Sequence, residues 1–266
     1  MSWLITDLSS PISISIPYSL EFNGTDERMI SSAVFDVGNA NQWTIMGWIK
    51  TDVAALSDVA NFLYWQFPSA GSNNSIQIAV VDPFAEQTKG GLSILTAKSN
   101  GSAFKELSWY DRLTDDTWAQ YVYTYDGASG GDPLVLYLDG ASAGAPDAAT
   151  KDGIGTMDNT DTRDIQLGGV TLHSPNYGFP GLVHQTAMWS VPLTASEILA
   201  IYNGGSAGFD LTANSGNYSS SSNLLHWWQL GANASNWGED TGSHSTLKDL
   251  TATNMDASNR IEEGPI

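Results

Sequence analysis

"PLVLYLDGASAG" (residues 133–144) decides the fold of this chain, because it reads as a buried strand that runs into a tight turn. Its leucines at alternate positions would face one side of the strand, and Val135 and Tyr137 would face the other. Asp139 and Gly140 tolerate the positive φ angles that a tight hairpin requires. The segment therefore predicts one strand of an antiparallel sheet.

The segment just before it, "WAQYVYTYDG" (118–127), is a similar run of β-branched and aromatic residues that also ends in Asp-Gly. Together the two segments predict an antiparallel pair. Short strand-like runs recur along the chain, broken by Gly, Asn, Asp and Ser, at 13–22, 42–51, 61–67, 75–81, 91–97, 105–110, 164–170 and 181–191. This spacing is typical of an antiparallel sandwich or jelly roll and not of a βαβ fold.

One helix is predicted, in "TASEILAIYNGG" (194–205). Thr194 can cap its N-terminus, and Glu197 completes a capping box. Ile198 and Ile201 form part of an apolar stripe, and Gly204 can end the helix. The pattern indicates a short helix packed against a sheet.

Two further segments follow the helix. "GSAGFDLTANSGNYSSSSN" (205–223) is polar and predicts a long loop or linker. "LLHWWQLG" (224–231) is strongly apolar and predicts another strand. Because two tryptophans would not be left in water, we expect this segment to dock on the rest of the chain.

Composition narrows the class of protein. The 266 residues suffice for one large β domain, or for one domain plus an appendage, and 41% of them are hydrophobic, which argues against disorder. Ten Lys and Arg against twenty-nine Asp and Glu give a net charge of −19, so nucleic acid and membrane surfaces are excluded as partners. The acidity fits either solubility or cation binding. With no cysteine, disulfides and thiolate sites are excluded.

No catalytic motif is present in the sequence. None of the glutamates begins the Glu-x-Asp-x-x-Glu pattern of sandwich-type glucanases, and the four histidines lack metal-ligand spacing. There is also no nucleophile elbow or phosphate loop. The sequence therefore predicts a protein that is not an enzyme.

One turn has the residue types of a cation site. In "SLEFNGTDERM" (19–29), Asn23 and Asp26 flank a Gly-Thr turn whose oxygens could hold Ca²⁺. The alternative is a plain turn in which both side chains bond their own backbone.

Six segments, in order, resemble the laminin-G-like family: "SLEFNGTDERM", "WTIMGWIKT", "TWAQYVYTYDG", "LVLYLDG", "IQLGG" and "GLVHQTAMWSVPLTASEILAIYNGG". The resemblance covers about residues 18–205. It implies an all-β, two-sheet antiparallel jelly-roll sandwich of the concanavalin A-like type with one short helix, used as a binding module and often holding calcium. Asn23 and Asp26 match the calcium motif. Where the family has Asp-Glu, this chain has His184-Gln185, and neutral imidazole is a poor calcium ligand.

The C-terminal stretch 223–255 resembles the segment that normally precedes the first family motif. The resulting division is an N-terminal arm (1–17), a laminin-G-like jelly roll (18–205), a polar linker (206–223) and a C-terminal segment (224–266) that docks on the jelly roll and completes it. This arrangement is similar to structural proteins of tailed phages and marine viruses.

Two functions follow as hypotheses. The first is a non-enzymatic virion surface protein, a capsid decoration protein or a head or tail fibre component, whose partners are other virion proteins and copies of itself. It would be made in the host cytoplasm, since residues 1–20 do not read as a signal peptide, and displayed on the virion exterior. The arm would add a strand to a partner's sheet.

The second hypothesis is a carbohydrate-binding lectin module of a cellular protein. Trp65, Trp109 and Tyr110 are the candidates for stacking on sugar rings, and burial in the core is the alternative for each. A third hypothesis, a hydrolase, would require two carboxylates about 5–10 Å apart in a groove.

Overall fold

The computed structural model describes residues 18–31, 42–56, 61–68, 75–81, 90–97, 104–127, 134–150, 163–169, 178–204 and 209–265. Within these ranges the chain forms two eight-stranded antiparallel sheets and one α-helix, so the fold is the expected jelly-roll sandwich. The strands are β1 (Ser19–Asn23), β2 (Arg28–Ser31), β3 (Gln42–Lys50), β4 (Asn61–Pro68), β5 (Ser75–Val81), β6 (Gly91–Ala97), β7 (Phe104–Trp109), β8 (Ala119–Asp126), β9 (Leu134–Leu138), β10 (Ala141–Ser142), β11 (Ala148–Thr150), β12 (Arg163–Leu167), β13 (Pro180–Trp189), β14 (Leu224–Trp228), β15 (Leu250–Thr253) and β16 (Arg260–Ile261). The helix α1 spans Ala195–Asn203, and short 3₁₀ turns lie at Val53–Ala55, Ser221–Asn223 and Ala257–Asn259.

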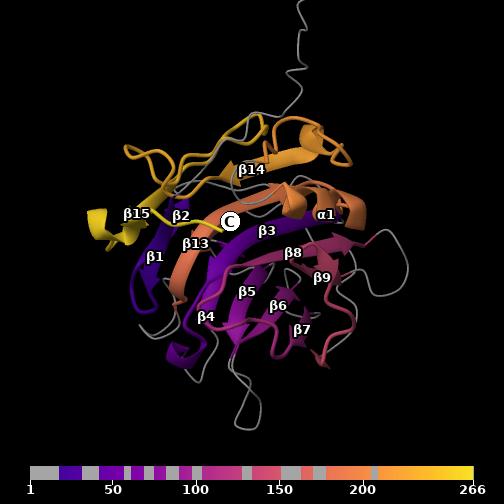
Figure 1. The fold of residues 1–266 in the computed structure, drawn as a ribbon, viewed down its shortest axis with the longest axis horizontal. Helices are drawn as coiled ribbons and strands as arrows, with labels where there is room; N and C mark the ends of the chain where they lie inside the picture. The colour runs from indigo at the N-terminus through magenta and orange to yellow at the C-terminus, as the bar shows by residue number, and fades with distance from the viewer. Residues whose placement is uncertain are drawn as a thin grey trace, which may run out of the picture.

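In Figure 1, β3, β8, β9 and β13 of the first sheet lie above β4, β5, β6 and β7 of the second. The first sheet has the strand order β10-β9-β8-β3-β13-β1-β16, and β14 also pairs with β13. The second sheet has the order β11-β7-β6-β5-β4-β12-β2-β15. The expected strands at 42–51, 75–81 and 91–97 are found within one residue of their expected ends.

The hairpin predicted from the opening segment is confirmed. β8 and β9 pair antiparallel, with Tyr123 opposite Leu136. Asp139 and Gly140 have φ angles of 48° and 77°, so both central residues of the turn into β10 are left-handed. A side chain at Gly140 would also meet Tyr202, whose ring atoms would lie 3.0 Å from its Cβ.

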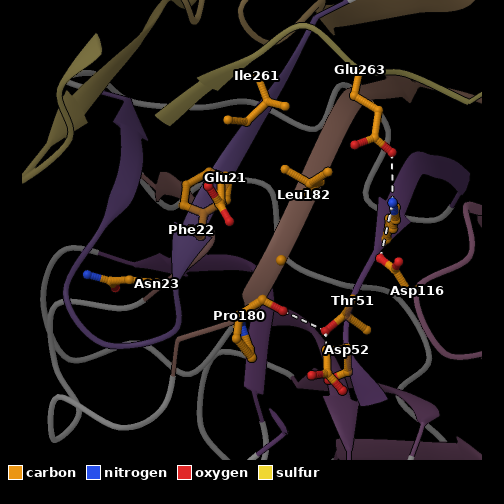
Figure 2. A pocket seen from close by; sticks show the side chains of 12 residues that line it. Glu21, Phe22, Asn23, Thr51, Asp52, Asp116, Pro180, Leu182, Ile261 and Glu263 are labelled. Carbon is orange, nitrogen blue, oxygen red and sulfur yellow. Dashed lines mark hydrogen bonds and ion pairs between the residues drawn. The ribbon is translucent and has the colours of Figure 1, made fainter. Parts of the chain in front are cut away.

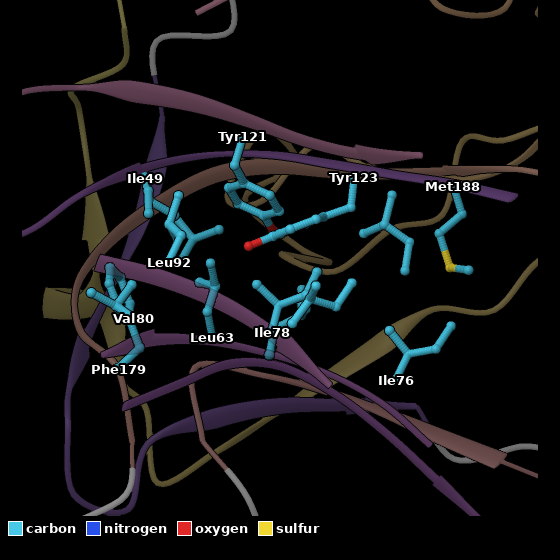
Figure 3. Packing of buried hydrophobic residues seen from close by; sticks show 14 of the residues in the cluster. Ile49, Leu63, Ile76, Ile78, Val80, Leu92, Tyr121, Tyr123, Phe179 and Met188 are labelled. Atoms are coloured by element: carbon cyan, nitrogen blue, oxygen red, sulfur yellow. The ribbon is translucent and has the colours of Figure 1, made fainter. Parts of the chain in front are cut away.

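The inner faces of the two sheets enclose the main core (Figure 3). Alternation places Leu134 and Leu136 of β9 in it, while Tyr137 contacts a second apolar cluster on the other face. Tyr123 reaches across the sheet gap toward Leu92 and Leu63, as Figure 3 shows. The core also holds Trp43, Trp109 and Tyr125, so it is rich in aromatic rings.

The second apolar cluster lies on the outer face of the first sheet. Met46 and Val122 of the sheet pack there with Ile198 and Ile201 of α1. Trp48 stacks on Tyr202, with ring centroids 5.7 Å apart. Helix α1 thus covers one part of this outer face, and Figure 1 shows it at one end of β3.

The helix begins as the sequence predicts. Thr194 accepts a hydrogen bond from the backbone N–H of Glu197, and the Glu197 carboxylate accepts one from the backbone N–H of Thr194, which completes the capping box. The same carboxylate accepts hydrogen bonds from Ser219 and from Ser220, at 3.1 Å and 2.6 Å. One residue therefore binds the helix start to the segment that follows it.

The expected polar linker is packed over its described part, residues 209–223. Leu211 and Tyr218 are buried, and the indole N–H of Trp189 donates to the Tyr218 hydroxyl at 2.9 Å. That hydroxyl in turn donates to the Leu211 carbonyl at 2.9 Å. Over this part the chain forms turns and bends, and Leu211 and Tyr218 anchor it against the second apolar cluster.

The C-terminal strands pair with both sheets. β14 pairs with β13, β15 with β2, and β16 with β1. β1 and β14 follow each other along the same edge of β13, whose other edge pairs with β3. Among the described residues no helix is long and apolar enough to cross a membrane. The arm 1–17 lies outside the described residues.

Candidate functional site

Three side chains form a row across neighbouring strands of the first sheet. Glu21 of β1 lies opposite Leu182 of β13, and Leu182 lies opposite Lys50 of β3. Opposite residues of antiparallel strands project on the same face. Since the neighbouring Ile49 is in the core, the row lies on the outer face. It occupies a part of this face away from the second apolar cluster.

Lys50 is held between two carboxylates. Its Nζ lies 2.8 Å from the Glu263 Oε1 and 3.1 Å from the Asp116 Oδ1, as the dashed lines in Figure 2 show. The hydrogen bond to Glu263, then that to Asp116, raises the pKa of Lys50 against the opposing effect of burial. The indole N–H of Trp118 also donates to the Glu263 Oε1, at 3.2 Å. The group joins three distant segments of the chain.

These residues line a pocket of about 420 Å³. Leu182 and Ile261 are apolar parts of its wall, and Figure 2 shows both beside the Glu21 carboxylate. The complete lining is Glu21, Phe22, Asn23, Lys50, Thr51, Asp52, Asp116, Pro180, Gly181, Leu182, Ile261 and Glu263. The pocket therefore combines apolar side chains with four carboxylates and one ammonium group.

Backbone packing at Gly181 shapes the floor of the pocket. Its φ angle is +148°, and a Cβ there would lie 2.4 Å from the Lys50 carbonyl oxygen. Only glycine fits this close approach of β13 to β3. Beside it, the Thr51 hydroxyl donates to the Pro180 carbonyl at 2.5 Å, which ties the end of β3 to the start of β13.

The C-terminal wall is fixed by contacts on either side of β16. The Asn259 side-chain amide donates to the Glu21 carbonyl at 3.0 Å. The Arg260 Nε donates to the Gly231 carbonyl at 2.7 Å, and its guanidinium lies 3.4 Å from the centre of the Tyr18 ring. These contacts place Ile261 and Glu263 over the first sheet.

The predicted calcium turn is closed on itself. The Asn23 side-chain oxygen accepts from the backbone N–H groups of Thr25 and Asp26, at 2.8 Å and 3.1 Å. Its amide nitrogen donates to the Asp26 Oδ1 at 2.9 Å, and the Asn254 amide donates to the Asp26 Oδ2 at 3.1 Å. Both carboxylate oxygens thus face N–H donors, the opposite of what a cation requires. Calcium binding here stays a prediction.

His184 and Gln185, the departures from the family pattern, serve packing. His184 is fully buried, with its Nδ1 2.7 Å from the Tyr18 carbonyl and its ring edge-on to Trp118. The Gln185 side-chain oxygen accepts from the Trp227 indole at 2.8 Å. Across the described ranges no three His, Cys, Asp or Glu side chains gather as a metal site.

The three aromatic candidates lie in different surroundings. Trp109 is 1% exposed in the core, and its indole donates to the Gly144 carbonyl at 3.1 Å, which corrects the expectation that it stacks on a sugar. Trp65 lies in β4 opposite Gln166, and its side chain is outside what the structure describes. Tyr110 is half-buried beside Asp147 and stays a prediction.

A family model gives the decisive comparison. The model described as the concanavalin A-like lectin/glucanase superfamily matches residues 23–199. The chain belongs to this superfamily. No curated protein matches the chain in sequence.

Solved structures of the superfamily's fold share little sequence with the chain. A candidate carbohydrate-binding protein from Bacteroides ovatus superposes with a TM-score of 0.59 at 18% identity, over 96% of this chain and 62% of that one. A pentraxin from Limulus polyphemus gives 0.50 at 13% identity, over 73% and 84%. The CBM40 module of a Ruminococcus gnavus sialidase gives 0.50 at 14%, over 71% and 99%. At these identities the likeness shows the fold alone.

Apart from Asn23, sequence reasoning missed the residues that line the pocket. Lys50 ends a predicted strand, where a charged residue on the outer face carries no motif. Its partner Glu263 is 213 positions away. One signal was present: only ten basic residues stand against twenty-nine acidic ones, so each cation has a choice of carboxylate partners.

Proposed function

We propose that this chain is a non-catalytic carbohydrate-binding module, and that the pocket around Lys50 is its glycan site. The observation that carries the proposal is the row Glu21–Leu182–Lys50, which sets an apolar side chain between charged ones inside a pocket of about 420 Å³. Small-molecule sites have volumes of roughly 300–1,000 Å³ and combine apolar walls with a few polar groups.

The row suits the two-sided chemistry of a sugar ring. A pyranose has a face of C–H groups and a rim of hydroxyls. Leu182 and Ile261 can contact the C–H face, while the carboxylates of Glu21 and Glu263 accept hydrogen bonds from hydroxyls. Hydrogen bonds to ionised acceptors are about twice as strong as neutral ones. The pocket thus offers both kinds of contact at adjacent positions.

The same geometry argues against hydrolysis. A glycosidase requires one carboxylic acid that can protonate the leaving oxygen, beside a second carboxylate. Here Asp116 and Glu263 both bind the Lys50 ammonium, at 3.1 Å and 2.8 Å. The ammonium group lies between them and binds both, so this pair is not free to flank a glycosidic bond. We therefore expect no turnover of any polysaccharide in a panel.

The fold of the neighbours supports this role. The Bacteroides ovatus and Ruminococcus gnavus structures with this architecture are a candidate carbohydrate-binding protein and a carbohydrate-binding module. That function is theirs, and for this chain it is the proposal.

The test is a glycan array followed by calorimetry on the best glycan. Leu182→Ala should lower the affinity at least about tenfold, equal to about 1.4 kcal/mol. Leu199→Ala is the matched control, because Leu199 is 45% exposed on α1 and lies outside the pocket. This substitution should leave the glycan affinity unchanged. Circular dichroism checks that both variants fold. Absence of binding to every glycan, or equal losses in the two variants, would contradict the proposal.

A virion surface role remains a second proposal. It rests on the resemblance to virus structural proteins, together with the observed placement of β14 after α1 but against β13. In that setting the module would be displayed on the particle for stabilisation or attachment, with copies of itself as partners. Electron microscopy of particles labelled with an antibody to the chain would test it, and unlabelled particles would contradict it.

A further inference from the structure

The pocket around Lys50 has a strongly one-sided charge. Its charged lining residues are the four acids Glu21, Asp52, Asp116 and Glu263 and the single base Lys50. The whole chain is acidic as well, with a net charge of −19. A ligand that enters this pocket therefore meets excess negative charge both locally and at a distance.

The one base does not offset this charge for a ligand. Lys50 already binds Glu263 and Asp116, and its side chain is only 17% exposed. In contrast, the Glu21 carboxylate accepts no hydrogen bond from the described residues, although its backbone carbonyl does. The side-chain groups left for a ligand are therefore mostly acceptors.

We infer that the site selects glycans without acid groups, and that it binds an amino sugar more tightly than the corresponding neutral sugar. This inference rests on the proposed function and names the ligand class of the same pocket. Hydroxyl and ammonium groups donate hydrogen bonds to acceptors such as the Glu21 carboxylate. A sugar carboxylate would be an additional acceptor of the same charge, close to Glu263.

The order of affinities is the test. A glycan array holding neutral, amino and acidic members of the glucose and galactose series is read first. Calorimetry then compares β-1,4-linked tetramers of glucosamine, glucose and glucuronic acid, or the galactose-series sugars if the array favours them. We expect the amino member to bind at least about threefold more tightly than the neutral one, and the acidic member at least about tenfold more weakly.

Two substitutions separate the pocket from the general acidity of the chain. Glu21→Gln should lower the preference for the amino sugar by about threefold, and it should leave the fold intact because Glu21 is exposed. Glu262→Gln removes one charge from an exposed residue next to Glu263 that does not line the pocket, and it should leave the preference unchanged. At about 1 M salt, where the screening length falls to about 3 Å, the preference should shrink.

The outcomes are distinguishable. Three results would overturn the inference while leaving a carbohydrate-binding module. They are acidic sugars that bind as tightly as neutral ones or more tightly, an amino sugar that binds no better than the neutral one, and equal effects of Glu21→Gln and Glu262→Gln. Absence of binding to every class on the array would overturn the proposed function itself.

Discussion

Two networks of charged groups, around Asp240 and around Lys50, differ in what completes them. The Asp240 carboxylate is buried and accepts from the backbone N–H groups of Trp227, Gly242 and Lys248, at 3.0, 3.0 and 2.7 Å, and its Oδ2 lies 2.5 Å from His226 Nδ1. The Lys50 network is made of side chains alone, at the rim of a pocket.

The difference separates a structural role from a binding role. The Asp240 carboxylate is bound by three backbone N–H groups and by His226, so this network stabilises the turn after β14. Around Lys50, Asp116 is 73% exposed and Glu263 is 39% exposed. Their remaining lone pairs face water, which a ligand can displace. Exposed ion pairs of this kind contribute little stability.

The largest expected effect on stability comes from truncating the chain after Asn223. This removes Asp240 from one network and Glu263 from the other. It strips β14 from β13 and β15 from β2, and it removes the fully buried Trp228. We expect a chain that does not fold cooperatively, measured by thermal unfolding. Deletion of residues 1–17 is the comparison, and it should weaken self-association without lowering the Tm. An unchanged Tm after truncation would show that the C-terminal segment is an independent appendage.

Asp240→Asn tests the buried network alone. The substitution keeps the shape but replaces one acceptor with an NH₂ group that faces backbone N–H donors. We expect a loss of about 3 kcal/mol in the free energy of unfolding, measured with urea. Glu239→Gln, at the exposed neighbouring position, should cost less than about 1 kcal/mol. Equal losses of unfolding free energy in the two variants would mean that the buried hydrogen bonds of Asp240 do not stabilise the fold.

The two networks should respond to pH in opposite directions. Burial lowers the pKa of His226 and so favours its neutral form, while for Asp240 burial is outweighed by the donors from His226, Lys248 and Gly242, which hold its pKa below the usual value. Both groups bind fewer protons when folded, so stability should fall as the pH drops below about 6.5 and further below about 4.

The raised pKa of Lys50 has the opposite sign. Its contribution is complete below about 10.5 and is lost only as the pH rises through the folded pKa. Unfolding free energies from pH 3 to 11 would show both limbs. His226→Gln should flatten the decline between pH 6.5 and 4, and a decline that persists unchanged would assign it to other groups.

Glu263→Gln should hardly affect folding. The carboxylate is 39% exposed, and an exposed ion pair contributes about 0–1 kcal/mol. The same variant should lose glycan affinity by threefold or more, measured by calorimetry. If stability fell as much as in Asp240→Asn, the Lys50 network would be a structural element and the contrast between the two networks would fail.

The smallest effect is expected at Tyr123. Its hydroxyl is buried with no hydrogen-bond partner among the described groups, and burial, with Tyr121 nearby, raises its pKa well above the ordinary value. Tyr123→Phe should leave the protein equally stable or raise stability by up to about 1 kcal/mol. A clear loss would reveal a bound water or another partner of the hydroxyl.

Local signals made much of the fold predictable. Asp139-Gly140 fixes the hairpin turn, and Thr194 with Glu197 fixes the helix start, because each needs only residues a few positions apart. The short strands β2 and β15 were missed, since four residues carry too little periodicity. The burial of Tyr218 could not be foreseen, because the residues around it are polar.

The site could not be predicted in the same way. The Glu21–Leu182–Lys50 row exists only once the register of β1, β13 and β3 is known. A shift of one residue in any of these strands would turn its member of the row inward. Trp109 was a reasonable candidate for sugar stacking by residue type. Its position opposite Leu92 on β6, inside the sandwich, is again a matter of register.

The pairing of β1 with β16 has a consequence for how this module can be connected to other proteins. Ser19 lies opposite Ile261, so the chain enters and leaves the sandwich at one corner, about one strand spacing apart. Such a module can be spliced into a surface loop of a host protein without stretching the host at the insertion point. It would then project as a side branch, with the mouth of its pocket close to the stem.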